Sequence, residues 1–125
     1  MHPGSRRRAG RHAWRWGRFA EALAALLLRA KGYRILARRY RSAAGEIDIV
    51  ARRGNVIAFV EVKARPDAAS AAEAVTSRQR RRLWRAALLF LAERPALESC
   101  VLRFDAMLIR PWRLPQHWVD AWQRD

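Results

Sequence analysis

Two short linkers divide the first half of the chain into three consecutive strand-like segments, and this spacing limits the possible folds more than any other feature. The segments cover residues 33–41, 46–53 and 56–64, so the linkers are residues 42–45 and 54–55. Linkers this short join neighbouring antiparallel strands, because a parallel connection needs a much longer crossover. The sequence therefore predicts an antiparallel three-stranded meander.

Helical periodicity and one further strand surround the meander. Apolar residues recur at helical spacing over residues 16–30, and a second helix is expected from residue 70 or 71 to residue 93. Residues 101–109 are typical of another strand, and residues 110–125 predict an irregular tail with at most one short turn of helix. The order α-β-β-β-α-β predicts an α/β fold with a central mixed sheet flanked by helices.

Length and cysteine content bound the architecture and the compartment. A chain of 125 residues fits one domain with its own core. We expect residues 1–13 to form a disordered basic arm, residues 14–110 the folded domain, and residues 111–125 a tail that packs on it. The single cysteine, Cys100, excludes an internal disulfide and is typical of a reducing cytoplasm. The apolar run at residues 22–28 is too short to cross a bilayer, so a membrane is not an expected partner.

Strong positive charge indicates the class of partner. The chain has 26 Lys plus Arg against 11 Asp plus Glu, a formal net charge of +15. Charge of this size is typical of proteins that bind polyanions, so nucleic acid, most simply DNA, is the expected partner. The candidate phosphate contacts are Arg78, Arg81, Arg82, Arg85, Arg39 and Arg41. For the first four, which lie at helical spacing, a solvated helix face is the alternative explanation.

Acidic residues are few in the first half of the chain, and they lie on predicted regular elements. Residues 1–66 contain only Glu21, Glu46, Asp48 and Glu61. Glu21 lies on a helix face of small apolar residues, where a carboxylate is costly unless it is paired, hydrogen-bonded or held by a metal. These positions make the acids candidates for a functional site.

Strand pairing brings two of the acids together. A two-residue turn at 54–55 sets Asp48 opposite Glu61 and Glu46 opposite Lys63. Directly opposed side chains have Cβ atoms roughly 4.5–5.5 Å apart, so the two carboxylates repel each other unless a positive charge lies between them. A divalent cation, Mg²⁺ or Mn²⁺, provides that charge and accepts one or two protein carboxylates.

Lys63 is unusual in a chain that otherwise uses arginine for positive charge. Only two of the 26 basic residues are lysines, and Lys63 lies on the same strand face as Glu61. A compact ammonium beside a metal can polarise water and offset charge in the transition state of phosphodiester hydrolysis. The alternative is a salt bridge between Glu46 and Lys63 at the strand end, with Asp48 a surface acid.

Five motifs, in order over residues 16 to 109, closely resemble the YraN family of small bacterial proteins. They are Gly17-Arg18-Phe19-Ala20-Glu21, Lys31-Gly32-Tyr33, Gly45-Glu46-Ile47-Asp48-Ile49-Val50, Phe59-Val60-Glu61-Val62-Lys63 and Arg103-Phe104-Asp105. That family is similar to archaeal Holliday junction resolvases and to the PD-(D/E)xK nucleases, so the resemblance implies a restriction-endonuclease-like fold. Ile47 stands where the nuclease motif is named for proline, and Arg78-Gln79-Arg80 stands where relatives carry a Lys-Gln pair.

The resemblance also implies roles for individual residues. Glu21, Asp48 and Glu61 would surround a metal ion, and Lys63 would assist the nucleophilic water. A homodimer is the resolvase-like expectation, and no small-molecule cofactor is expected. The leading hypothesis is thus a metal-dependent endonuclease acting on structured or branched DNA. The alternatives are a non-catalytic nucleic-acid-binding module with the nuclease fold, and a scaffold recruited by charge to an acidic protein or membrane.

Overall fold

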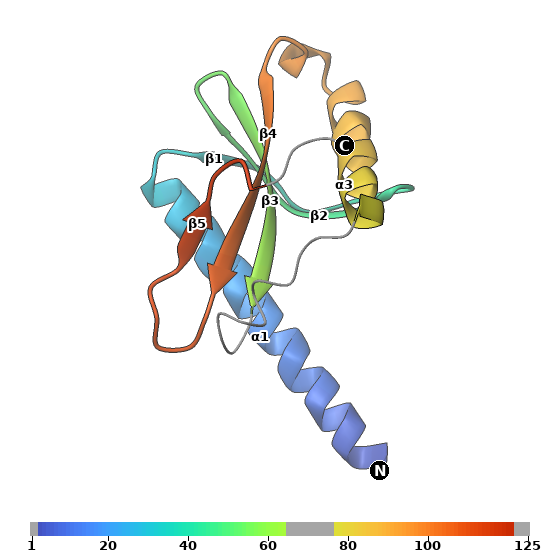
Figure 1. The fold of residues 1–125 in the computed structure, drawn as a ribbon, viewed down its shortest axis with the longest axis vertical. Coiled ribbons are helices and arrows are strands. Elements are labelled where there is room, and N and C mark those ends of the chain that lie inside the picture. Colours follow the sequence, from blue (N-terminus) through green and yellow to red (C-terminus); the bar gives the residue numbers. More distant parts are fainter. Residues whose placement is uncertain (1–2, 65–76, 122–125) are drawn as a thin grey trace.

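A computed structural model describes residues 3–64 and 77–121 of the chain, with side chains from residues 17–64 and 78–121. Its α/β architecture confirms the predicted element order and is consistent with a restriction-endonuclease-like fold (Figure 1). The elements are α1 (Pro3–Ala30), β1 (Arg34–Ser42), β2 (Gly45–Arg53), β3 (Val56–Ala64), α3 (Ser77–Ala92), the short 3-10 helix η1 (Pro95–Leu97), β4 (Val101–Ile109) and β5 (Gln116–Trp118).

One mixed sheet holds all five described strands, in the order β1-β2-β3-β4-β5. The first three strands form the predicted antiparallel meander, and β2 pairs with β3 from Ile49↔Val60 to Arg53↔Val56, the register of a two-residue turn. β4 runs parallel to β3. A parallel neighbour requires a long crossover, and α3 lies within that connection.

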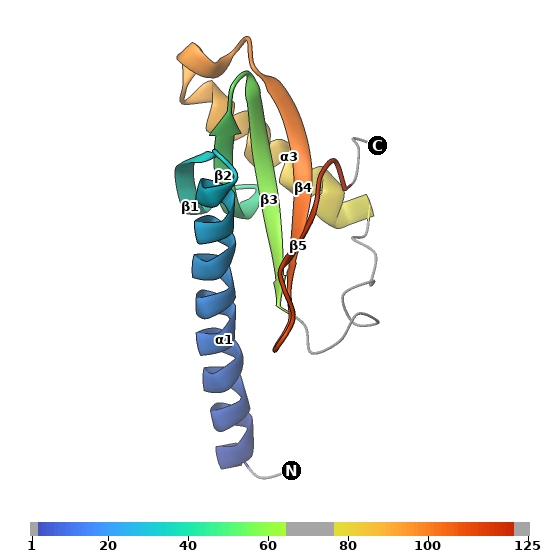
Figure 2. The ribbon, with the colours of Figure 1, turned by 90° about the vertical axis from the view of Figure 1, so that its left-hand side faces the viewer.

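The two helices cover opposite faces of the sheet (Figure 2). On the α1 side, small helix residues such as Ala24 and Ala25 pack against Ile49 and Val60. On the α3 side, Phe90 packs against Phe59 at a ring-centroid distance of 6.0 Å. The buried alanines let α1 lie close to the strands, so polar groups on its inner face meet the sheet directly.

Helix α1 extends beyond the sheet at its N-terminal end (Figure 1). It begins at Pro3, so its first turns lie in the segment expected to be a disordered arm, and the boundaries of arm, domain and tail stay a prediction. No helix in the described parts of the chain is long and apolar enough to cross a membrane.

A glycine follows the end of α1 and terminates the helix. Gly32 has a φ of +92°, a conformation that side chains disfavour. The Tyr33 N–H donates to the Leu28 carbonyl at 2.9 Å, and the Gly32 N–H donates to the Arg29 carbonyl at 3.0 Å. This pair of bonds is a Schellman motif, and it turns the chain sharply into β1.

The end of the chain contains a strand where the sequence suggested at most a turn of helix. β5 pairs antiparallel with β4 through Ala106↔Trp118, Met107↔His117 and Leu108↔Gln116. It covers the free edge of β4. The predicted start of the second helix, at residue 70 or 71, lies outside the described residues, and α3 ends at Ala92, close to the predicted residue 93.

Candidate active site

The sheet is irregular at Asp48. Ile47 packs in the cluster under α3, whereas Ile49 packs in the cluster under α1, although regular alternation would place both on one face. On the neighbouring strand, Arg39 has a φ of +50° between the pairs Arg38↔Ile49 and Tyr40↔Ile47. The regular alternation of side chains between the two faces of the sheet is thus interrupted on β2 at Asp48.

The side chain of Asp48 takes a position that a backbone carbonyl would fill in a regular ladder. Its Oδ2 accepts a hydrogen bond from the Val62 N–H at 2.8 Å. A side-chain hydrogen bond also links Asp48 with Glu61. The structure therefore brings together the two carboxyl groups that the two-residue turn predicted to be neighbours. Lys63 follows Glu61 by two residues on β3 and is half-buried.

A cavity of about 310 Å³ lies beside these groups, between α1 and the ends of the strands. Helix α1, the three meander strands and mostly charged side chains line it. The lining residues are Gly17, Arg18, Glu21, Arg39, Arg41, Glu46, Asp48, Val62 and Ala64. Glu61 and Lys63 are outside this set, so Asp48 is the group that connects the carboxyl pair with the cavity.

Glu21 reaches the cavity from the inner face of α1 and is only 6% exposed. Its Oε1 accepts hydrogen bonds from the Arg38 Nε at 3.2 Å and the Arg39 Nε at 3.1 Å. These two arginines compensate the buried carboxylate, which the sequence required to have a partner. Arg41, the other candidate phosphate contact on β1, forms an exposed ion pair with Glu46 at 3.4 Å.

Burial, and to a lesser extent the charges of Glu21 and Glu46, raise the pKa of Asp48 from its ordinary value to about 6. The hydrogen bonds from Val62 and with Glu61 lower the pKa but do not outweigh burial. Two carboxyl groups can share a hydrogen bond only while one of them holds a proton. A cation between them would replace that proton and allow both to ionise.

The donor set fits a small oxygen-seeking cation. Among the described residues, no group of three or more His, Cys, Asp and Glu side chains is arranged to hold a metal. Asp48 and Glu61 nonetheless supply two adjacent carboxylates, which suits Mg²⁺, because Mg²⁺ keeps several waters and needs few protein ligands. The third predicted ligand, Glu21, lines the same cavity but is bonded to Arg38 and Arg39.

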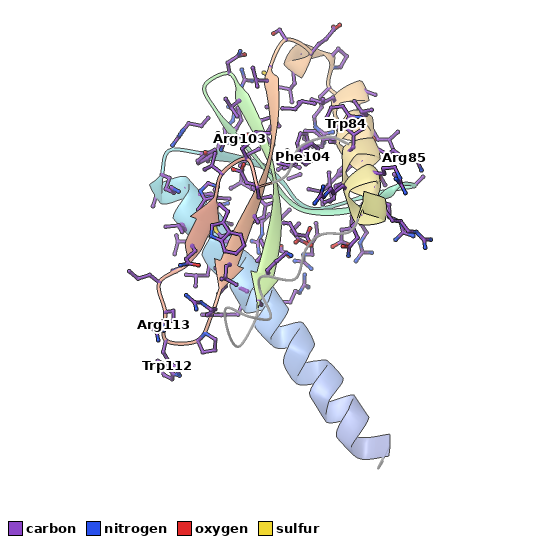
Figure 3. All side chains as sticks on the ribbon, in the orientation of Figure 1. Trp84, Arg85, Arg103, Phe104, Trp112 and Arg113 are labelled. Carbon is purple, nitrogen blue, oxygen red and sulfur yellow. The ribbon has the colours of Figure 1, made fainter. Side chains whose placement is uncertain are left out.

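The basic stripe predicted on the second helix lies on the outer face of α3. Arg78, Arg81, Arg82 and Arg85 are all exposed. Trp84 instead faces the core and packs against Phe104 at a centroid distance of 5.7 Å, and Figure 3 shows Arg85 turned away from that contact. Of these four arginines, Arg82 lies beside the start of β2, because its Cβ is about 4.0 Å from the position that a Cβ on Gly45 would occupy.

Sequence reasoning missed some members of the site. Arg18 was quoted only within a motif, although it lies three residues before Glu21 and therefore on the same helix face. Arg38 was not among the candidate site residues, whereas it is a direct partner of Glu21. A carboxylate on an apolar helix face signals a missing partner, but sequence alone does not say which arginine provides it.

A second acidic group lies on the same face of the sheet, in β4. Asp105 is fully buried and accepts two hydrogen bonds from Arg103 at 2.8 Å, one to each of its oxygens. It also contacts the His117 Nε2 at 2.8 Å and accepts from the Asp120 N–H at 2.9 Å. Burial alone would raise the pKa of Asp105, but these hydrogen bonds lower it to about 2. These contacts give Asp105 a structural, hydrogen-bonding role.

Comparison with known proteins identifies relatives over most of the chain. The profile of the uncharacterised protein family UPF0102 matches residues 20–109. A UPF0102 protein of Paramagnetospirillum magneticum is 55% identical over 122 residues, which cover 94% of this chain and 95% of the relative. One from Bradyrhizobium diazoefficiens is 59% identical over 109 residues, covering 87% of this chain and 82% of the relative. Both names leave the activity open.

Proposed function

We propose that the chain, which belongs to the uncharacterised protein family UPF0102 (the YraN family), is a metal-dependent endonuclease for structured or branched DNA. The names of its relatives assign no activity. The observation that carries the proposal is the hydrogen-bonded pair of Asp48 and Glu61 at a break in the sheet, with the pKa of Asp48 raised to about 6. Perturbed carboxyls beside a charged cavity are typical of catalytic sites.

In this proposal, Asp48 and Glu61 hold a magnesium ion between β2 and β3. When bound there, Mg²⁺ supplies Lewis acidity and orients a water for attack on phosphorus. Lys63 lies two residues from Glu61 and donates to the water and to the negative charge that develops in the transition state. Glu21, aligned by Arg38 and Arg39, adds a negative charge at the cavity wall.

Phosphate binding is assigned to the arginines around the cavity and on α3. Arg39 and Arg41 line the cavity, and Arg82, one of the four exposed arginines of α3, lies beside Gly45 at the start of β2. A surface with this many arginines binds nucleic acid with a strong dependence on salt concentration. We assign the protein to the cytoplasm, where its DNA substrate lies, and infer a homodimer whose two sites would cut symmetric strands.

A non-catalytic nucleic-acid-binding module is the second candidate function. It is favoured by the two arginines that already bind the Glu21 carboxylate, because a metal ion would have to compete with them. In this alternative the arginines grip phosphate, and the acids only maintain the local structure.

Cleavage and binding assays on a panel of substrates separate the two candidates. Four-way junction, flap, single-stranded and linear duplex DNA are incubated with the protein in Mg²⁺, in Mn²⁺ and in chelator. We expect metal-dependent cutting that is lost in Asp48→Asn, while binding persists. Glu98→Gln is the matched control, because Glu98 is an exposed acid far along the chain from the cavity.

Each other outcome has a definite meaning. Binding without cutting on every substrate supports the module instead of the enzyme. Cutting that persists in Asp48→Asn contradicts the assigned site. Loss of all nucleic-acid affinity at low salt contradicts both candidates. Sedimentation of the protein alone and with the junction tests the homodimer.

A further inference from the structure

Three polar side chains form a line outside the cavity, at the C-terminal end of α1. The buried Asp105 Oδ2 lies 2.8 Å from the His117 Nε2, and the His117 Nδ1 lies 2.6 Å from the Lys31 Nζ. Lys31 is exposed, whereas the side chain of His117 is only 2% exposed. A carboxylate, an imidazole and an amine are thus ordered from the core to the surface.

The two neighbours of His117 require the same tautomer. The Asp105 carboxylate only accepts hydrogen bonds, so the Nε2 of His117 must carry a hydrogen. A Lys31 ammonium only donates, so the Nδ1 must offer its lone pair. Arg103 and the Asp120 N–H hold Asp105 in place, and Tyr33 packs edge-on to the imidazole at 6.1 Å. The ring is therefore oriented with a proton acceptor toward the amine.

The surface around Lys31 is positively charged. Arg53 Nη1 donates to the Lys31 carbonyl at 3.3 Å, and its guanidinium lies 4.6 Å above the Tyr33 ring. Arg29 and Arg34 are exposed on either side of Lys31 in the sequence. Phosphate groups would be attracted to this surface. Lys31 is one of only two lysines in the chain, so generic charge does not account for an amine at this position.

We propose that Lys31 is a nucleophilic amine that forms an imine with an aldehyde on a phosphate-bearing chain, such as the ring-opened sugar of an abasic nucleotide. His117 is the positioning residue and proton carrier, and Asp105 fixes the orientation of its ring. This activity is independent of metal and of the carboxyl pair at Asp48.

The proton inventory of the step closes without another reactant. The Lys31 ammonium gives one proton to the His117 Nδ1, and the free amine then attacks the aldehyde carbon, forming the C–N bond. A proton moves from the nitrogen to the alkoxide, giving a carbinolamine. The nitrogen lone pair expels the hydroxyl, which takes the proton back from His117 and leaves as water. The products are a protonated imine on Lys31, one water and neutral His117.

Borohydride trapping tests the proposal directly. The full chain is incubated with abasic-site DNA in chelator, where metal-dependent cutting is silent, and borohydride reduces the imine to a stable cross-link. We expect a cross-link that mass spectrometry locates at Lys31 and that is lost in Lys31→Arg. His117→Asn should lower the cross-linking rate by about 100-fold. It should also change the pH profile of that rate, which a purely structural role would leave unaltered.

A charge-matched double variant provides the control. Lys31→Arg combined with Arg34→Lys keeps the charge and moves the amine three positions along the same basic surface, away from the imidazole. We expect this variant to cross-link as poorly as Lys31→Arg. Cross-linking equal to the wild type in the double variant, or a cross-link located elsewhere in the chain, would overturn the proposal. Asp48→Asn should cross-link normally, so a failed nuclease proposal and a failed amine proposal are distinguishable.

Discussion

Asp48 and Asp105 occupy neighbouring regions of one sheet, yet their environments shift the pKa values of their carboxyl groups in opposite directions. Burial opposes ionisation of both carboxyls. The pKa of Asp105 nevertheless falls to about 2, because His117, Arg103 and the Asp120 N–H all donate to it. The pKa of Asp48 rises to about 6, because burial and the charges of Glu21 and Glu46 outweigh its hydrogen bonds with the Val62 N–H and Glu61.

The contrast shows that hydrogen-bond donors, and not burial alone, decide whether the pKa of a buried carboxyl rises or falls. Groups of the protein itself supply the hydrogen-bond donors that the Asp105 carboxylate requires, so it needs no ligand and stabilises the fold. Asp48 is under-satisfied in a place where the sheet is already irregular, and it opens onto a cavity. Such a site lowers the stability of the isolated protein, so a bound ligand can stabilise the protein most there. Functional sites often have this property.

The largest predicted effect is the loss of Asp105. Asp105→Asn removes the counter-charge that the fully buried Asp105 provides to the part-buried Arg103 guanidinium, so we expect a loss of about 3–5 kcal/mol in the free energy of unfolding at pH 7. Urea denaturation measures it. Asp120→Asn is the matched control, because only the backbone N–H of Asp120 bonds to Asp105 and should remain. A loss below about 1 kcal/mol would contradict the structural assignment of Asp105.

The second prediction has the opposite sign. The pKa of Asp48 is about 6 in the folded protein, against an ordinary value of 3.8, so the folded state binds the proton more tightly. That stabilisation is complete below about pH 4 and is lost as the pH rises through 6. Asp48→Asn stays neutral, so it should be more stable than the wild type by about 2–3 kcal/mol at pH 7.5.

The pH dependence is the internal control for this prediction. At pH 4 the difference between Asp48→Asn and the wild type should nearly disappear, because both side chains are then neutral. Asparagine can still accept from the Val62 N–H, so the substitution tests charge and not the backbone contact. Destabilisation by Asp48→Asn at pH 7.5 would mean that Asp48 resembles Asp105 after all.

Local sequence signals were sufficient to predict the antiparallel meander, the position where α1 ends and the pairing of Asp48 with Glu61. The turn at residues 54–55 sets the register of β2 and β3, and Gly32 can adopt the positive φ that ends the helix. Both signals act over a few residues. A short turn leaves little freedom in strand pairing, so the sequence was enough to predict that Asp48 and Glu61 are neighbours on adjacent strands.

Contacts between distant segments were not predictable in this way. The residues that satisfy Glu21 lie 17 and 18 positions away, and Lys31 and His117 are separated by 86 positions. β5 has only three residues, too few for a periodic pattern, and it is recognised only by its pairing with the edge of β4. The spacing of the three histidines in the sequence does not indicate a site. The contact between His117 and Asp105 is therefore evident only from the three-dimensional structure.

Metal binding provides a third and smaller test of the contrast. If Asp48 and Glu61 hold Mg²⁺, the ion should stabilise the wild type at pH 7.5 by about 1.4 kcal/mol at a concentration tenfold above its dissociation constant. Thermal unfolding with and without Mg²⁺ measures this. Asp48→Asn should show no such shift, whereas Glu98→Gln should respond as the wild type does. An equal shift in Asp48→Asn would place the binding elsewhere.

The smallest stability effect is expected at the rim of the cavity. The pair between Arg41 and Glu46 is 3.4 Å long, with side chains 80% and 41% exposed, so solvent screens it. Arg41→Gln should change the free energy of unfolding by no more than about 0.5 kcal/mol. Its effect on nucleic acid should be larger in relative terms: one lost phosphate contact lowers the slope of log affinity against log salt by about 1. Fluorescence anisotropy across a salt series measures that slope. An unchanged slope would remove Arg41 from the binding surface, and a large loss of stability would mean that the cavity rim is held by the same kind of donor network as Asp105.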